Sequence, residues 1–188
     1  DGAVRDNVML SFDGTWQVAR PLQLYGEMLI DDIHVMSDDH PTRLGYQGGL
    51  YVVGSLRGHE WRTRLEGTRV WNYVYSTFYH ADFSHEGAPL GYPLGPDSRD
   101  IRFRSEWIIS RPWTLTTMAE RVDRGEGKLG AAWMPHDSTF AGAKPSHFQG
   151  VVETQWKLAA GLRYYAGDRL QLLAELGPSL VKNANHVA

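Results

Sequence analysis

The stretch RDIRFRSEWIIS, residues 99–110, alternates apolar with polar or charged side chains over most of its length. Because successive side chains of an extended strand point to opposite faces, this pattern predicts a strand with two unlike faces. The apolar face carries Ile101, Phe103, Trp107 and Ile109. The opposite face carries Arg102, Arg104 and Glu106. A soluble sheet turns the apolar face inward, whereas an outer-membrane barrel turns it toward lipid and keeps the charges in a wet interior.

Composition excludes several classes of function. The net charge of −3 gives no basic surface, so we expect no nucleic-acid partner. The absence of cysteine excludes disulfides, thiolate metal sites and cysteine nucleophiles. No run of about 18 apolar residues predicts a transmembrane helix. The mean hydropathy of −0.40 suits a soluble protein, but a barrel with alternating faces averages to a similar value.

Alternation with a period of two recurs along the whole chain and predicts eight strands, most of them of roughly 10 to 14 residues. They cover residues 8–18, 22–31, 44–56, 61–75, 99–110, 113–120, 155–164 and 169–176. Strands of globular sheets average about five or six residues, so these are long. Arg69 breaks the pattern, because it falls on the apolar face with Leu65. A bulge near Gly67 would return it to the polar face.

The connections between these strands alternate strictly between short and long. Short ones lie at residues 20–21, 57–60, 111–112 and 166–168, and long ones at 34–43, 76–98 and 124–147. This order predicts an up-and-down meander with tight turns at one rim and long loops at the other, as in outer-membrane barrels. It also places the start of the first strand and the end of the last strand at the long-loop rim. We therefore expect residues 1–188 to form a single β-barrel domain that is a continuous piece of a larger barrel.

Three observations favour an all-β, antiparallel, up-and-down transmembrane β-barrel. The strands are long enough for the 9 to 11 residues that cross a bilayer. The polar face carries charges of both signs along most of its length. Aromatic residues gather near strand ends, where barrels have interfacial girdles: Trp16, Trp61, Trp71, Tyr73, Trp113 and Tyr164. The alternative is a soluble sandwich or lipocalin-like barrel in which the charged face is outside.

Two segments resemble the capsule-assembly (Wzi-type) outer-membrane family. They are LYGEMLIDDI at residues 24–33 and GYPLGPDSRDIRFRSEW at residues 91–107. The resemblance covers roughly residues 8–180 and corresponds to the C-terminal half of the family pattern; nothing here matches the N-terminal half. It implies a large monomeric barrel that binds capsular polysaccharide at the cell surface, helps to attach capsule, and is not an enzyme.

The predicted loop YHADFSHEGAPLGYPLGPDS, residues 79–98, is the candidate polysaccharide site that this resemblance implies. Aromatic rings there would stack on sugar rings, and carboxylates would take the hydroxyls. The candidate residues are Tyr79, His80, Asp82, Phe83, His85, Tyr92 and Asp97. The same imidazoles and carboxylates, with Glu86, would suit a metal or a water-activating pair, but no ligand spacing matches a rigid metal site. We expect no metal, no cofactor and no catalytic residue; a plain polar surface loop is the simplest alternative.

A second set of residues is predicted to line the barrel lumen: Glu27, Asp31, Arg62, Arg64, Glu66, Arg102, Arg104, Glu106 and Glu120. A ladder of cross-strand ion pairs that fills the lumen is the favoured role for most of them. Alternatively, Arg102 and Arg104 would attract acidic polysaccharide, since guanidinium groups bind carboxylates in a bidentate manner. Asp31 and Asp32 are adjacent and cannot both face the lumen unless the chain turns there.

The leading hypothesis is a non-enzymatic outer-membrane barrel of a Gram-negative-type envelope, with lipid and capsular or surface polysaccharide as partners. The first alternative is a substrate-selective porin, which differs in having an open lumen. The second is an outer-membrane hydrolase, which requires the loop histidines and aspartates to converge within hydrogen-bonding reach.

Overall fold

The structure is a computed structural model that describes residues 8–32, 42–77, 82–130 and 146–188. Its strands are β1 (Leu10–Ala19), β2 (Leu22–Asp32), β3 (Arg43–Leu56), β4 (His59–Val70), β5 (Ser84–His85), β6 (Ala88–Pro89), β7 (Ser98–Ser110), β8 (Trp113–Arg124), β9 (Glu153–Ala166), β10 (Leu170–Leu176) and β11 (Ser179–Lys182). A short 3₁₀ turn, η1, follows at Ala184–His186. Among the described residues, no helix combines the length and apolar character needed to cross a membrane.

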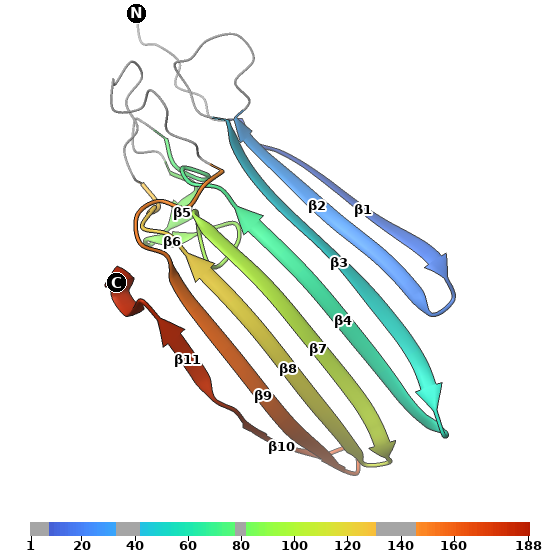
Figure 1. The fold of residues 1–188 in the computed structure, drawn as a ribbon. Coiled ribbons are helices and arrows are strands. Elements are labelled where there is room, and N and C mark those ends of the chain that lie inside the picture. The colour runs from blue at the N-terminus through green and yellow to red at the C-terminus, as the bar shows by residue number, and fades with distance from the viewer. Residues whose placement is uncertain (1–7, 33–41, 78–81, 131–145) are drawn as a thin grey trace, which may run out of the picture.

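Nine of these strands form one antiparallel sheet. Eight of them follow the order β1-β2-β3-β4-β7-β8-β9-β10, and β11 pairs with the beginning of β9, at residues 154–157. The short links at residues 20–21, 57–58, 111–112 and 167–169 all lie at one end of the sheet, and the described parts of the connections 71–97 and 125–152 lie at the other (Figure 1). The predicted all-β, up-and-down meander is confirmed. Within the described residues β1 and β10 do not pair with each other, so this sheet is open.

The predicted fourth strand was too long. It ends at Val70, and the chain then turns, with Tyr73 and Tyr75 in the left-handed region at φ 67° and 71°. The backbone N–H of Tyr75 donates to the Asp31 carboxylate at 2.8 Å instead of to a neighbouring strand. The apolar alternation of residues 71–75 therefore reflects packing of a loop. The hairpin β5–β6 and strand β11 were not predicted, because strands of two to four residues carry too little alternation.

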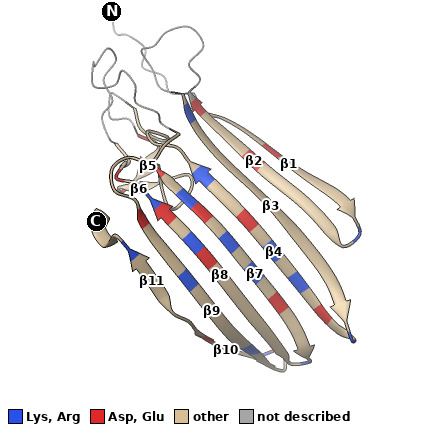
Figure 2. Cartoon of the chain, in the orientation of Figure 1, with Lys and Arg blue, Asp and Glu red and all other residues tan. Residues whose placement is uncertain are grey.

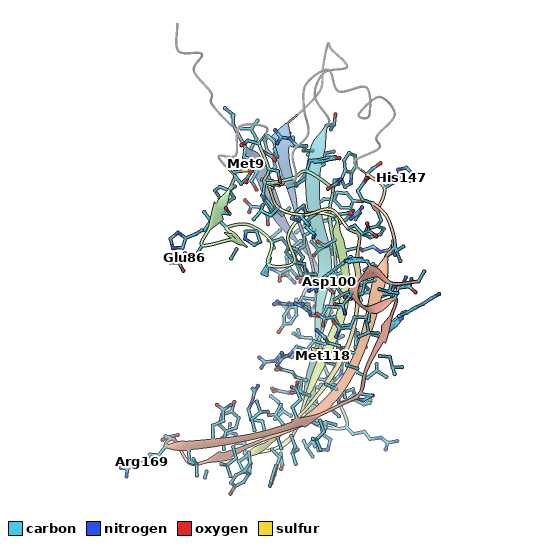
Figure 3. All side chains as sticks on the ribbon, turned by 90° about the vertical axis from the view of Figure 1, so that its left-hand side faces the viewer. Met9, Glu86, Asp100, Met118, His147 and Arg169 are labelled. Carbon is cyan, nitrogen blue, oxygen red and sulfur yellow. The ribbon has the colours of Figure 1, made fainter. Side chains whose placement is uncertain are left out.

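The register separates two faces of the sheet. One row across it reads Tyr25, Gly49, Glu66, Arg102, Glu120 and Lys157. The neighbouring row on the opposite face reads Leu24, Leu50, Leu65, Phe103, Ala119 and Leu158. Edge-on, the sheet is curved, and the β5–β6 hairpin with Glu86 overhangs its concave side (Figure 3). The hairpin belongs to the connection between β4 and β7, called here the segment 71–97, of which residues 71–77 and 82–97 are described. These residues contact the charged rows, so the charged face is concave and the apolar face is convex.

The convex face is uncovered. Leu65, Phe103 and Leu158 are 41%, 38% and 55% exposed, although they lie in the middle of the sheet. The buried apolar cluster is small and comprises Val70 of β4 with Val74 and Tyr75 of the segment 71–97. A soluble sandwich would bury the convex face, since contiguous apolar patches larger than a few hundred Å² mark contact with a partner or a membrane.

The predicted bulge near Gly67 is wrong. Pairing of β4 with β3 and with β7 runs through Gly67 without a shift, so Arg69 stays on the convex face. Its guanidinium folds under the loops at the end of the sheet and donates to the carbonyls of Val70 and Ser98, both at 2.9 Å. A charged residue is accommodated there because the long connections cover the strand end.

Candidate functional site

The concave face carries a network of cross-strand ion pairs centred on Glu120. This carboxylate accepts from Arg102 Nη2 at 2.5 Å and lies 3.1 Å from Lys157 Nζ. Arg102 Nη2 also lies 3.0 Å from Asp100. Figure 2 shows the resulting alternation of basic and acidic residues across β4, β7, β8 and β9. The Glu120 carboxylate of β8 is thus paired with basic side chains of both neighbouring strands, β7 and β9, and Asp100 is paired with Arg102 of its own strand.

A second cluster lies nearer the short turns. Glu106 accepts from Arg62 Nε at 2.5 Å and from Arg104 Nη2 at 3.0 Å. Arg64 is directly opposite Arg104 in the register, and its guanidinium lies 5.9 Å and 5.7 Å from the ring centres of Tyr25 and Tyr51. Aromatic faces thus take the place of a carboxylate partner for Arg64.

The structure therefore brings seven of the predicted lumen residues together on the concave face: Arg62, Arg64, Glu66, Arg102, Arg104, Glu106 and Glu120. Glu66 accepts from the Tyr25 hydroxyl at 2.6 Å. Glu27 lies on the same face, nearer the long connections, and accepts from Ser11 at 3.0 Å. Their role as the lining of a closed lumen stays a prediction.

Asp31 has a different place from the other predicted lumen residues. The register shifts between Ile30 and Asp32, so Asp31 is an extra residue in the ladder, and it is buried. Its carboxylate lies 3.4 Å from Arg43 Nη1 and accepts from the Tyr75 backbone. Arg43 in turn donates to the Ser76 carbonyl. Asp31 and Arg43 thus bind the backbone of the segment 71–97 to the end of the sheet.

A cavity of about 560 Å³ lies between the concave face and the segment 71–97. The strands contribute Glu27, Leu29, Thr68 and Val70 to its walls. The segment contributes three aromatic side chains, Tyr75, Phe83 and Tyr92. The cavity is at the long-connection end of the sheet, within the size range of ligand sites.

The three aromatic residues hold one another in place. The Tyr75 hydroxyl accepts from the Tyr92 backbone N–H at 2.9 Å, and the Tyr75 ring centre lies 6.1 Å from that of Phe83. The Tyr92 hydroxyl donates to Asp100 at 2.8 Å. Burial, together with this bond to a carboxylate, raises the pKa of Tyr92 well above its usual range, so its hydroxyl stays protonated and donating. A side chain at Gly91 would overlap the Tyr75 ring, so glycine is required there.

The predicted loop residues fall into separate groups. Tyr79 and His80 lie outside the described residues. Phe83 and Tyr92 line the cavity. His85 is exposed at the β5–β6 hairpin, with its Nε2 4.0 Å from Glu86. Asp82 accepts from the Thr77 backbone N–H at 2.9 Å and so shapes the loop.

Asp97 is fully buried and joins the connection between β4 and β7 to the connection between β8 and β9. One carboxylate oxygen accepts from the backbone N–H groups of Gly127 at 3.1 Å and Gln149 at 2.9 Å, and the other lies 3.6 Å from Arg69 Nη2. The Arg69 guanidinium also lies 3.9 Å from the ring centre of Phe148. In this conformation the Asp97 carboxylate does not reach the solvent, so its predicted contact with a sugar would need a movement of the loop.

Sequence reasoning missed Tyr75, which shapes the cavity, because its alternation with Tyr73 was assigned to a strand. No cluster of three or more histidine, aspartate or glutamate side chains suited to a metal ion occurs in the part of the chain that the structure describes.

Comparison with known proteins identifies the family. The family model described as capsule assembly protein Wzi matches residues 7–188. The chain belongs to this family. Members of the Wzi family are outer-membrane proteins of Gram-negative bacteria, and their part in capsule assembly agrees with the resemblance seen in the sequence. No curated protein and no solved structure matched the chain.

Proposed function

We propose that this chain forms part of the wall of an outer-membrane barrel and binds capsular polysaccharide, without catalysis, in the cavity beneath the segment 71–97. The observation that carries the proposal is the position of that cavity. It lies at the long-connection end of the sheet, between three aromatic side chains and a part of the concave face to which Glu27 contributes a carboxylate. In outer-membrane barrels this end faces the outside of the cell.

The dimensions of the convex face support a place in the bilayer. Along β7, the convex positions from Ile109 to Ile101 are apolar except for Ser105. Eight residue steps at about 3.3 Å each give roughly 26 Å of strand. A tilt of about 40° reduces this to roughly 20 Å, close to the height of about 25 Å of the apolar band of outer-membrane barrels.

Aromatic pairs mark the short-turn end of this band. The ring centres of Trp61 and Trp107 are 5.9 Å apart, and those of Trp113 and Tyr164 are 4.5 Å apart. Trp156 lies on the convex face toward the other end and is 49% exposed. Such residues occupy the two membrane interfaces of barrels, where an amphipathic ring meets both headgroups and acyl chains.

The cavity has the chemistry that a polysaccharide requires. Phe83 is partly exposed and offers a ring face to a sugar, and the Glu27 carboxylate offers oxygen atoms to hydroxyl groups. The fixed bonds of Tyr92 and Tyr75 hold the aromatic wall in position before binding, which lowers the entropy that binding costs.

Replacing Phe83 with alanine is expected to weaken polysaccharide binding by roughly tenfold, because a stacked ring contributes about 1.4 kcal/mol. The measurement is calorimetric titration of the complete protein, purified in detergent, with the capsular polysaccharide of its own bacterium. Leu90→Ala is the matched control, since Leu90 is an exposed apolar residue of the same segment and does not line the cavity. Equal affinities for wild type and the Phe83 variant would contradict the proposal.

A substrate-selective channel is the second candidate. The cross-strand pairing of Arg102, Glu120 and Lys157 satisfies these charges without a permeating solute and so favours the binding role. Recordings of ionic conductance in planar bilayers distinguish the binding protein from the channel. We expect no steady conductance, because the binding role implies a closed lumen. A steady conductance that capsular fragments inhibit would favour the channel.

A further inference from the structure

Two arginines lie at the border between the convex apolar face and the long connections. Arg99 of β7 is opposite Asp123 of β8 in the register, and Arg121 of β8 is opposite Ile101 of β7. Both arginine side chains belong to the convex face and are 41% and 36% exposed. The polysaccharide cavity lies on the concave face, so the pair has no part in it.

A single buried carboxylate fixes both guanidinium groups. Asp123 Oδ2 accepts from Arg99 Nη2 at 2.6 Å and Nε at 2.9 Å, and Oδ1 accepts from Arg121 Nη2 at 3.1 Å and Nε at 3.2 Å. Thr154 Oγ1 also donates to Oδ1, at 2.7 Å. Two cations thus share one anion, and the cluster keeps a net positive charge.

The pair retains hydrogen-bond donors that point away from Asp123. Each arginine uses Nε and Nη2 on the carboxylate, and among the residues that the structure describes neither Nη1 group has a partner. Guanidinium groups bind phosphate oxygens strongly, because the bonds are charge-assisted and planar. The arrangement is therefore a preformed site for an anion that carries several oxygen atoms.

The side chains around the two guanidinium groups are aromatic or apolar, which indicates that the ligand carries an apolar part as well as an anion. The Arg121 guanidinium lies 4.9 Å from the ring centre of Trp156, and Ile101 below it is 45% exposed. On the other side Phe148 lies 5.6 Å from the Arg99 guanidinium. A free anion would contact only the arginines, whereas a lipid phosphate would place its acyl chains on the apolar surface that begins directly beneath them.

We propose that Arg99 and Arg121 bind the phosphate of an outer-leaflet lipid headgroup. This inference rests on the orientation in the proposed function, in which the long connections face outward. Arg99, Arg121, Asp123 and Trp156 come from the neighbouring strands β7, β8 and β9, and Phe148 comes from the connection that precedes β9. It would fix the height of the barrel in the membrane and hold one lipid against its wall.

The experiment is native mass spectrometry of the complete protein, titrated with lipid A and with the same lipid after removal of its phosphates. Wild type is expected to bind the phosphorylated lipid on the order of tenfold more tightly. The double variant R99Q/R121Q is expected to lose this preference. R57Q/R111Q is the control, because these arginines lie at the short turns and should leave it unchanged.

The comparison of the two lipids on wild type needs no variant and so does not depend on folding of R99Q/R121Q. Equal binding of both lipids, or competition by inorganic phosphate at the same concentration as the lipid, would overturn the proposal. Polysaccharide binding is measured on the same samples. A lipid preference without polysaccharide binding would reject the proposed function and keep the lipid site, and the reverse result would do the opposite.

Discussion

Replacing Asp97 with asparagine is expected to lower the free energy of unfolding by about 3 kcal/mol. The carboxylate is fully buried, balances the buried Arg69 guanidinium, and accepts two backbone N–H groups. Asparagine keeps the size and tolerates the left-handed backbone that Asp97 adopts at φ 54°. The variant therefore removes the negative charge with little change in size, replaces one acceptor oxygen with an NH₂ donor, and leaves Arg69 buried without its anion.

The measurement is urea unfolding of the protein refolded in vesicles, followed by tryptophan fluorescence. Limited proteolysis should also cut the connections around Gly127 and Gln149 earlier than in wild type, since Asp97 joins them. Glu86→Gln is the control, because Glu86 is an exposed acid of the same segment and its loss should change stability by less than about 0.5 kcal/mol. A D97N protein as stable as this control would show that the buried pair is not what holds the connections together.

Replacing Phe103 with arginine is expected to cost about 2–4 kcal/mol, the penalty for a cation on the lipid face near the bilayer midplane. Phe103 lies in the middle row of the convex face and is 38% exposed. In water, an arginine at so exposed a position would cost less than about 0.5 kcal/mol. The loss of unfolding free energy therefore distinguishes a convex face in lipid from a convex face in water.

The matched control places the same side chain on the concave face. Gln47 is opposite Glu27 in the register, so arginine at this position would gain an anionic neighbour. Q47R is expected to leave the unfolding free energy within about 0.5 kcal/mol of wild type. If F103R and Q47R proved equally mild in vesicles, the convex face would not lie in lipid.

The strands and their order were predictable because alternation and turn residues are local signals. The quoted stretch 99–110 coincides with the body of β7, and the predicted turns at residues 20–21 and 111–112 are the observed links. The family could also be recognised from two short segments, and the family model confirms it.

The remaining features depend on residues far apart in the chain. The alternation assigned Glu120 to a face, but its partners, Arg102 and Lys157, follow only from the register. Asp97 reads as a turn residue, and its burial depends on Gly127 and Gln149, which lie 30 and 52 residues further along. The candidate loop was correctly seen to be rich in aromatic and acidic groups, while its sugar contacts stay a prediction.

The two unlike faces also protect the pairing of the strands against slippage. A shift of β7 by one residue would move Arg102, Arg104 and Glu106 onto the apolar face and bring Ile101 and Phe103 among the ion pairs. At about 2–4 kcal/mol for each arginine placed in lipid, the two arginines alone would make such a slip cost roughly 4–8 kcal/mol. With the convex face in lipid, as we propose, the alternation that reveals the fold in the sequence would thus also disfavour misaligned pairing of β7 during assembly.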